Sequence, residues 1–158
     1  MPVYMQYGNI LGDVTESSHV NWIELTSVQW GVSRSATNPT GSAAKRNIAA
    51  PRITELVVSK PQDVASVPLI LESLKGTPKT VKIDFARTGQ DRAEVYYSIS
   101  LSGAVITAFA QAATTDRPNE TLTLNFTEIS FQGTQMDKDG SGTSPSSYTW
   151  SVSNNAPA

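Results

Sequence analysis

The side chains best suited to chemistry are a single histidine and a set of scattered carboxylates. A hydrolase triad needs a base next to its nucleophile, and His19 is the one imidazole in the sequence. It follows Ser17 and Ser18, but the sequence has no Gly-x-Ser-x-Gly segment that would expose a nucleophilic serine on a sharp turn. We therefore predict that His19 is solvent-facing or hydrogen-bonded and has no catalytic role.

Glycoside hydrolysis needs two carboxylates that flank one bond. The acidic residues of this chain lie on separate predicted strands and loops, and only Glu24 and Glu128 sit within otherwise apolar strands that a fold could bring together. Acidic residues at alternating positions usually form the solvated face of a sheet. We predict no catalytic pair, and a small hydrolase that uses Glu24 or Glu128 stays as an alternative.

Composition limits metal and thiol chemistry. The chain has no cysteine, which excludes disulfides, thiolate nucleophiles and Cys-ligated metals, and one histidine cannot form a multi-histidine cluster. Segment 137–142 (DKDGSG) has the oxygen spacing of a calcium loop, but Tyr148 stands where the closing Glu is needed. We interpret the segment as a polar hairpin turn, and we expect a protein that is not an enzyme and has no metal and no cofactor.

Length and charge narrow the class of protein further. The 158 residues fit a single domain, 1–158. The 12 basic residues are scattered and the net charge is −2, so we expect no nucleic-acid partner. No apolar run is long enough to span a bilayer, and segment 1–7 lacks the features of a signal peptide. We expect a cytoplasmic protein that does not insert into membranes.

The hydrophobic pattern is mainly that of β-strands, about seven of them, which predicts an antiparallel barrel or sandwich. One long strand is predicted from Val20 to about Arg34, with a bulge or sharp bend between about Ser27 and Gln29, where the apolar phase slips. The three tryptophans are expected in the core: Trp22, Trp30 and Trp150.

One helix is predicted after Ser66, which is expected to be its N-cap, and Gly76 is expected to end it. The helix should pack against the barrel through one apolar stripe. The stripe consists of Val67, Ile70, Leu71 and Leu74.

Residues 35–52 break the strand pattern completely. The segment contains Asn38-Pro39, Gly41, several small residues and the basic pair Lys45-Arg46. A structureless stretch of this length is uncommon within a compact domain and is usually functional or disordered. Two interpretations remain open: a solvated surface loop, or an arm that becomes ordered only against another molecule.

A "W-G" strand lies at Trp30-Gly31, an "R-P-x-E" segment at Arg117–Glu120 and a closing "Y-x-W" strand at Tyr148–Trp150. Further segments of note are Gly12–Ser17, Ile23–Leu25 and Val58–Lys60, which leads to Asp63. In their order and spacing, these segments together resemble the Hcp (haemolysin-coregulated protein) family, the tube proteins of type VI secretion.

The resemblance implies a two-sheet antiparallel β-barrel with one flanking helix, six copies of which form a ring. Such rings stack into an inner tube, inside a sheath and below a spike, and leave the cell with effector proteins in the bore. The implied partners are therefore further copies of the chain, the spike protein, the sheath and effectors. The implied route is secretion through the type VI machine without a signal peptide.

The resemblance also suggests where contacts lie. We place Gln29, Gly31 and Ser33 near the bore of the ring. We expect the long loop 35–52 to contact another subunit or ring. Its candidate contact residues are Ser35, Asn38, Thr40, Lys45, Arg46 and Asn47. The alternative is a monomeric β-sandwich that binds a ligand.

Overall fold

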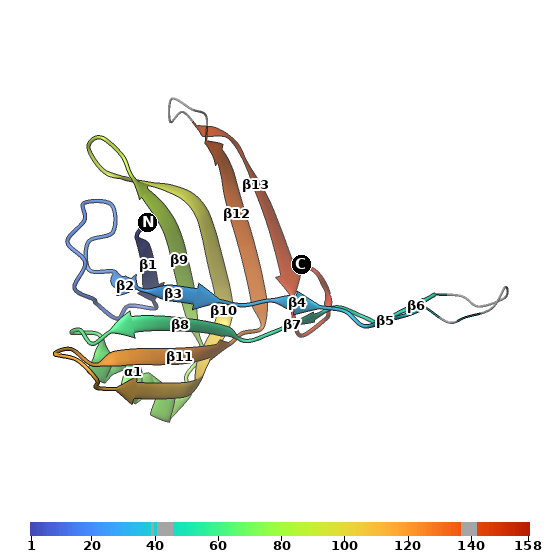
Figure 1. Ribbon diagram of the computed structural model, residues 1–158, viewed down its shortest axis with the longest axis horizontal. Helices are drawn as coiled ribbons and strands as arrows, with labels where there is room; N and C mark the ends of the chain where they lie inside the picture. The colour runs from blue at the N-terminus through green and yellow to red at the C-terminus, as the bar shows by residue number, and fades with distance from the viewer. Residues whose placement is uncertain (39, 41–45, 137–141) are drawn as a thin grey trace.

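A computed structural model describes residues 1–38, 40, 46–136 and 142–158 of the chain. The described part is mainly β with one helix (Figure 1). The strands are β1 (Val3–Tyr7), β2 (Ile23–Leu25), β3 (Ser27–Gln29), β4 (Val32–Ser33), β5 (Ala36–Thr37), β6 (Asn47–Ile48), β7 (Arg52–Ile53), β8 (Leu56–Pro61), β9 (Lys79–Thr88), β10 (Ala93–Ala112), β11 (Asn119–Asn125), β12 (Glu128–Met136), β13 (Gly142–Ser151) and β14 (Ala156–Pro157); the helix is α1 (Ser66–Lys75).

Two antiparallel sheets share the long strand β10. Sheet A runs β2–β1–β9–β10–β12–β13–β14, and sheet B runs β10–β11–β8–β3. The two-sheet antiparallel prediction is confirmed, although the described strands do not close into a continuous barrel.

Strand β10 changes sheet near Gly103. Its first half pairs with β9 and β12, and its second half pairs with β11. Gly103 has φ +62°, and a Cβ at this position would lie 2.6 Å from the Thr127 hydroxyl oxygen. Only glycine meets both conditions without strain, so it permits the bend that joins the sheets.

The core lies between the two sheets and is formed by alternating positions of their strands. In β8 and β11 buried and outward residues alternate, as expected of half-buried strands. The largest fully buried apolar side chains are Tyr7, Met5, Ile23, Leu56, Leu69, Ile83, Ile99, Leu101, Leu122, Leu124 and Ile129.

The single strand predicted from Val20 to Arg34 is wrong, because this segment forms three short strands. Strand β2 belongs to sheet A and β3 to sheet B, and the chain crosses between them at Thr26, whose N–H donates to the Ser59 carbonyl. The apolar phase slip therefore marks a change of sheet. Strand β4 then leaves the body as the start of a ribbon.

Helix α1 has the expected end but not the expected cap or packing face. Gly76 ends it with φ +67°, in the left-handed region, as predicted. Ser66 is not the N-cap; the N-cap position is Ala65, and the Asp63 carboxylate accepts a hydrogen bond from the Ala65 N–H. The buried contacts come from Ala65 and Leu69, whereas most of the predicted stripe faces away from the core.

Candidate assembly surfaces

The loop predicted at 35–52 is an arm: a two-stranded ribbon that projects from the body (Figure 1). Strand β4 pairs with β7 at its base, and β5 pairs with β6 farther out. The base is held by Thr54, whose N–H donates to the Gly31 carbonyl at 2.9 Å, while the Gly31 N–H donates to the Thr54 hydroxyl at 2.8 Å. All described arm residues are exposed except Pro51 and Ile53, which are half-buried.

Five of the six predicted contact residues lie in the described part of the arm. The Ser35 carbonyl accepts a hydrogen bond from the Ala49 N–H, and Asn47 lies in β6. Asn38, Thr40 and Arg46 are exposed farther along, and Lys45 lies outside the described residues. The arm is also strongly basic, because the sequence from 33 to 54 contains four basic residues and no acidic ones: Arg34, Lys45, Arg46 and Arg52.

The outward positions of sheet B carry uncharged side chains, and beside them the exposed Glu55 carboxylate accepts a hydrogen bond from the Thr107 hydroxyl at 2.7 Å. Val57 of β8 is the register partner of both Gln29 in β3 and Thr123 in β11, so these three residues lie side by side on the outward face. The face consists of Ser27, Gln29, Val57, Ser59, Thr121, Thr123, Ala108 and Ala110. Of the residues predicted near a bore, Gln29 lies on this face, whereas Gly31 and Ser33 lie at the base of the arm.

An apolar groove with a cavity volume of about 240 Å³ lies where the base of the arm meets the β12–β13 hairpin. Within it Trp30 stacks on Phe131, with ring centroids 4.8 Å apart. Trp30 and Trp150 thus pack against the core but also line a surface groove, so the prediction of core tryptophans holds only in part. The lining residues are Trp30, Val32, Arg34, Pro51, Ile53, Phe131, Tyr148 and Trp150.

A second apolar surface runs along the outer side of α1. Its exposed side chains are Val64, Val67, Leu71 and Leu74, which are between 48% and 80% exposed. Exposed apolar groups gathered on one surface usually mark a contact with another molecule. The groove and this helix ridge are therefore candidate contact surfaces.

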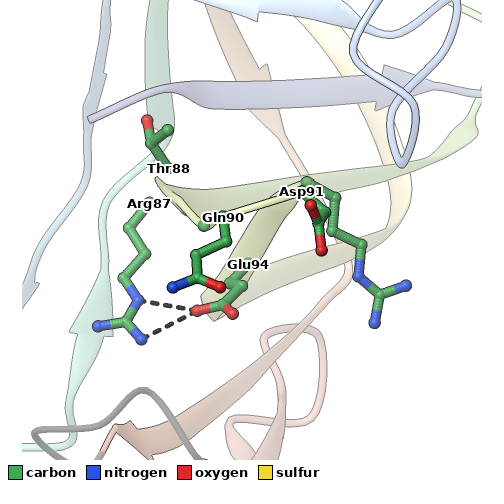
Figure 2. A pocket seen from close by; sticks show the side chains of 7 residues that line it. Arg87, Thr88, Gln90, Asp91 and Glu94 are labelled. Atoms are coloured by element: carbon green, nitrogen blue, oxygen red, sulfur yellow. Dashed lines mark hydrogen bonds and ion pairs between the residues drawn. The ribbon is translucent and has the colours of Figure 1, made fainter.

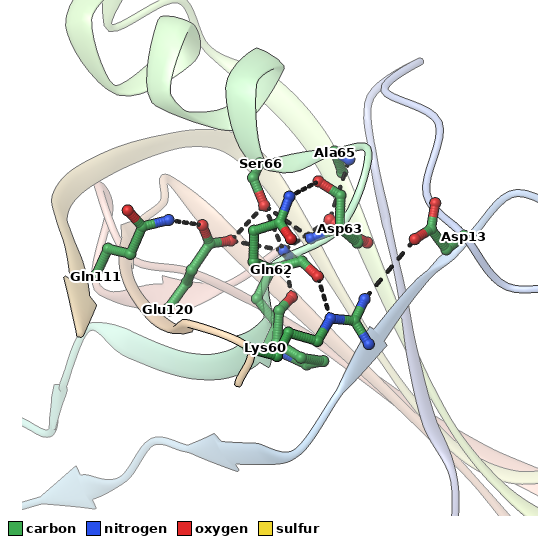
Figure 3. Close-up of polar contacts among 10 residues, drawn as sticks. Asp13, Lys60, Gln62, Asp63, Ala65, Ser66, Gln111 and Glu120 are labelled. Carbon is green, nitrogen blue, oxygen red and sulfur yellow. Dashed lines mark hydrogen bonds and ion pairs between the residues drawn. The ribbon is translucent and has the colours of Figure 1, made fainter. Parts of the chain in front are cut away.

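A buried polar network fastens α1 to sheet B (Figure 3). The Lys60 ammonium group lies 2.7 Å from Glu120 Oε1 and 2.8 Å from Asp63 Oδ1, and it also donates to the Pro61 carbonyl. The Ser66 hydroxyl, at the first residue of the helix, donates to Glu120 Oε1 at 2.7 Å. This explains why Ser66 does not cap the helix.

The network keeps Glu120 ionised. Burial alone would raise the pKa of Glu120, but hydrogen bonds from Lys60, Ser66 and Gln111 and the Lys60 charge outweigh it and lower this pKa. Just outside, Arg117 donates to the Gln62 carbonyl at 2.5 Å. Lys60, Asp63, Arg117 and Glu120 all lie in the segments that resemble the Hcp family, so these motif residues are structural.

His19 lies in a second buried polar cluster. It is hydrogen-bonded, which is one of the two outcomes predicted for it. It lies between the carboxylates of Glu16 and Asp84 and packs against Tyr4 and Trp22. No described serine or threonine lies within hydrogen-bonding distance of its ring, so the cluster has no triad geometry.

A cavity of about 530 Å³ follows the β9–β10 hairpin (Figure 2). Arg87 donates from Nε and Nη2 to the same Glu94 oxygen, at 3.0 and 2.9 Å. This pair neutralises the guanidinium and the carboxylate that face the cavity. The cavity is thus the concave side of a polar hairpin, and Asp91 and Arg92 also line it.

The two carboxylates considered for hydrolysis are far apart. Glu24 lies on β2 and Glu128 on β12, with β1, β9 and β10 between them in sheet A. Four strand spacings of about 4.8 Å separate them by roughly 19 Å, beyond the separation that glycoside hydrolysis uses. In the described residues, no group of three or more His, Cys, Asp or Glu side chains is placed to hold a metal ion. The calcium-loop segment 137–142 lies largely outside those residues.

Comparisons with known proteins agree on one family. A family model described as "Type VI secretion system effector, Hcp" matches residues 4–132. A solved "type six secretion system protein" has a TM-score of 0.91 and 22% identity, covering 99% of both chains. Hcp1 from Salmonella typhimurium has a TM-score of 0.79 and 16% identity, covering 99% of this chain and 98% of its own. Hcp1 from E. coli EAEC 042 gives 0.76 and 16%, covering 96% and 99%.

No curated protein matches the sequence. No helix in the described part of the chain is long and apolar enough to cross a membrane. The solved structures show the fold, and the family model, which covers most of the sequence, shows the family. The chain belongs to the Hcp family of the type VI secretion system, whose members are structural secretion proteins and not enzymes.

Proposed function

We propose that the chain is a structural subunit of the type VI inner tube, in which six copies form a ring and stacked rings carry or export effector proteins. Family membership supports the class of function. The spike protein, the sheath and effectors would be its partners, and it would leave the cell through the type VI machine.

The arm is the observation that carries this proposal. Its strands β4, β5, β6 and β7 form two separate two-stranded ladders, and an isolated two-stranded ribbon is at best marginally stable in water. An arm of this kind gains stability when it packs on another molecule. A second copy of the chain, in the next ring or the next position, provides such a surface in a tube.

Ring closure requires a head-to-tail interface, in which different surfaces of neighbouring copies meet. The chain has two exposed apolar surfaces for this purpose, the groove and the helix ridge. Among the described residues it also has an open strand edge, since β14 pairs with β13 only at Trp150 and Ser151. Unpaired edges readily accept another strand, and we propose that edge strands of neighbouring copies pair or nearly pair.

We assign the bore to the uncharged face of sheet B, which carries Gln29. Small, uncharged side chains such as Ser59, Thr121 and Ala110 bind no protein strongly, and this suits cargo that must move. Gly31 and Ser33 would lie at the rim, where the arm begins. A Gln29→Arg variant should keep the ring mass but change which effectors are retained.

Shortening the arm tests its role. Ser33 and Arg52 are register partners, so a two-residue Asn-Gly turn can replace residues 34–51. We expect this variant to lose ring stacking in negative-stain microscopy, with Gln90→Ala, at an exposed position of the β9–β10 hairpin outside the arm, as a full-length control. Stacks of normal length from the shortened variant would contradict the assigned contact. A monomeric wild-type chain with saturable ligand binding would favour the alternative, a ligand-binding β-sandwich.

A further inference from the structure

A buried imidazole links the segment between β1 and β2 to sheet A. His19 is only 2% exposed, although its neighbours Ser18 and Val20 are exposed. Its Nδ1 lies 2.8 Å from Glu16 Oε2, in the same segment, and its Nε2 lies 3.0 Å from Asp84 Oδ2, on β9. Each ring nitrogen therefore faces a different carboxylate.

Other groups around the ring fix it in this position. Tyr4 of β1 stacks on the ring and Trp22 meets it edge-on, each with centroids 4.7 Å apart. The second Asp84 oxygen accepts a hydrogen bond from Ser98 of β10 at 2.7 Å and lies 3.7 Å from the Lys82 ammonium group. Glu16 and Asp84 are thus the carboxylates that face the imidazole, and Lys82 is a cation that reaches one of them.

Glu16 extends this contact to a second loop. Its Oε1 accepts a hydrogen bond from the Ala93 N–H at 3.2 Å, at the start of β10, and its Oε2 accepts one from the Ser18 N–H at 3.1 Å. The β1–β2 segment and the β9–β10 hairpin are therefore joined at Glu16. The ring of His19 in turn joins Glu16 to sheet A.

Only the protonated ring satisfies this arrangement. An imidazolium donates from both nitrogens, whereas a neutral imidazole donates from one and presents a lone pair at the other. In the neutral state a lone pair would face a carboxylate oxygen at 2.8 or 3.0 Å, and the buried Asp84 or its counterpart Glu16 would lose a partner. A buried charge without a partner is strongly unfavourable.

We propose that His19, Glu16 and Asp84 form a proton-dependent latch, which holds the β1–β2 segment on sheet A while His19 is protonated and releases it when His19 loses its proton. The segment carries Leu11 and Val20, two exposed apolar side chains. The latch therefore sets how this apolar surface is presented to other molecules. It lies within one chain and does not depend on the proposed ring.

The two limits of the latch follow from charge. On the alkaline side it is lost as the imidazolium deprotonates. On the acid side it persists far below neutrality, because the hydrogen bond from His19, with those from Ser18, Ala93 and Ser17, lowers the pKa of Glu16 to about 2 despite an opposing effect of burial. The Glu16 carboxylate therefore stays available to the imidazolium well into the acid range.

The wild-type protein offers a direct test, because it contains a single histidine. The ring ¹⁵N resonances report both nitrogens through a pH titration, and amide hydrogen exchange is followed on the same samples. The protection factors of the Ser18 and Ala93 amides, which correct for base-catalysed exchange, should fall about tenfold or more as the ring deprotonates. The Ile99 amide, in the centre of sheet A, should keep its protection.

Variants separate the latch from general destabilisation. His19→Gln should give low, pH-independent protection at Ser18 and Ala93, and Ser17→Ala, which removes only an exposed hydroxyl bonded to Glu16, should follow the wild type. Protection that stays constant while the wild-type ring titrates would overturn the proposal. An identical pH profile in His19→Gln would overturn it as well.

Discussion

At the scale of single residues, Lys60 links the helix to the sheet. It is fully buried, and its charge is matched by Glu120 across the β8–β11 pair and by Asp63 just before the helix. Burying a cation is favourable only when partners replace its lost hydration. Both carboxylates therefore depend on the same cation, and removing Lys60 leaves each of them without its charged partner.

Replacing Lys60 by methionine should lower the free energy of unfolding by about 3–5 kcal/mol, because Glu120 and Asp63 would remain buried without a cation. Urea unfolding monitored by tryptophan fluorescence measures this change. Lys82→Met serves as the control; Lys82 is largely exposed and should contribute no more than about 1 kcal/mol. Equal losses in the two variants would show that the buried network does not stabilise the fold.

The lowered pKa of Glu120 predicts how stability depends on acid. A carboxyl group with a folded-state pKa below its ordinary value of 4.5 stabilises the protein above that value. That stability is lost as the pH falls through the folded-state pKa. The urea midpoint of unfolding, measured from pH 6 down to pH 2, should fall in the wild type. In Glu120→Gln the midpoint should be lower at pH 6 and should fall less with acid.

An exposed carboxylate gives the matching control, since Glu24→Gln should follow the wild-type curve. A Glu120→Gln curve parallel to that of the wild type at every pH would mean that another group controls the acid transition.

The sequence contains a signal for this network that motifs alone do not reveal. In the alternating pattern of β8, Lys60 falls on the same buried side as Leu56 and Val58. In β11, Glu120 falls on the same buried side as Leu122. Two opposite charges in buried phases predict a buried pair. Which strands would face each other could not be predicted, because the register of β8 and β11 depends on the whole sheet. For the same reason His19 could be predicted as hydrogen-bonded, but its partner Asp84, 65 residues away, could not be identified.

At the scale of elements, the helix shows the limits of a periodicity argument. The apolar positions of α1 cover more than one face, and the predicted stripe is mainly the outer one. The network at Ser66 and the insertion of Leu69 into the core fix the rotation of the helix. Both are tertiary contacts, which periodicity alone cannot reveal. The helix ends were partly predictable because Gly76 acts locally.

Two leucines five residues apart should therefore respond very differently. Leu69→Ala should destabilise the protein by about 2–5 kcal/mol, because it leaves a cavity in the core. Leu74→Ala should change stability by no more than about 0.5 kcal/mol, since Leu74 is 80% exposed. Urea unfolding below the concentration at which copies associate measures both. A larger loss of stability from Leu74→Ala than from Leu69→Ala would show that the predicted stripe packs against the core after all.

The arm illustrates a third kind of limit. Its polar, glycine-containing sequence correctly indicated that residues 35–52 leave the barrel, but its β-ladders were not predicted. Short pairs such as Val32↔Ile53 give too little alternation to identify a strand. The segment projects from the body as a ribbon (Figure 1), and its contact with another molecule stays a prediction.

At the scale of the whole molecule, features from separate parts of the chain favour assembly. The arm extends away from the body, an apolar groove lies at its base, an apolar ridge covers the helix, and one face of sheet B is uncharged. A monomer would leave all of these surfaces in water. In the proposed ring they would become contacts between copies, the arm would link to another copy, and the uncharged face would line the bore.

The mass of the wild-type protein in solution tests this account most directly. Light scattering after size exclusion, with the same peak viewed by negative-stain microscopy, gives the number of copies and their arrangement. We predict about 101 kDa, six times the 16.9 kDa of one chain, and rings with an open centre. A monomer of 16.9 kDa at micromolar concentrations would contradict the tube account and leave a ligand-binding β-sandwich as the better explanation of the fold.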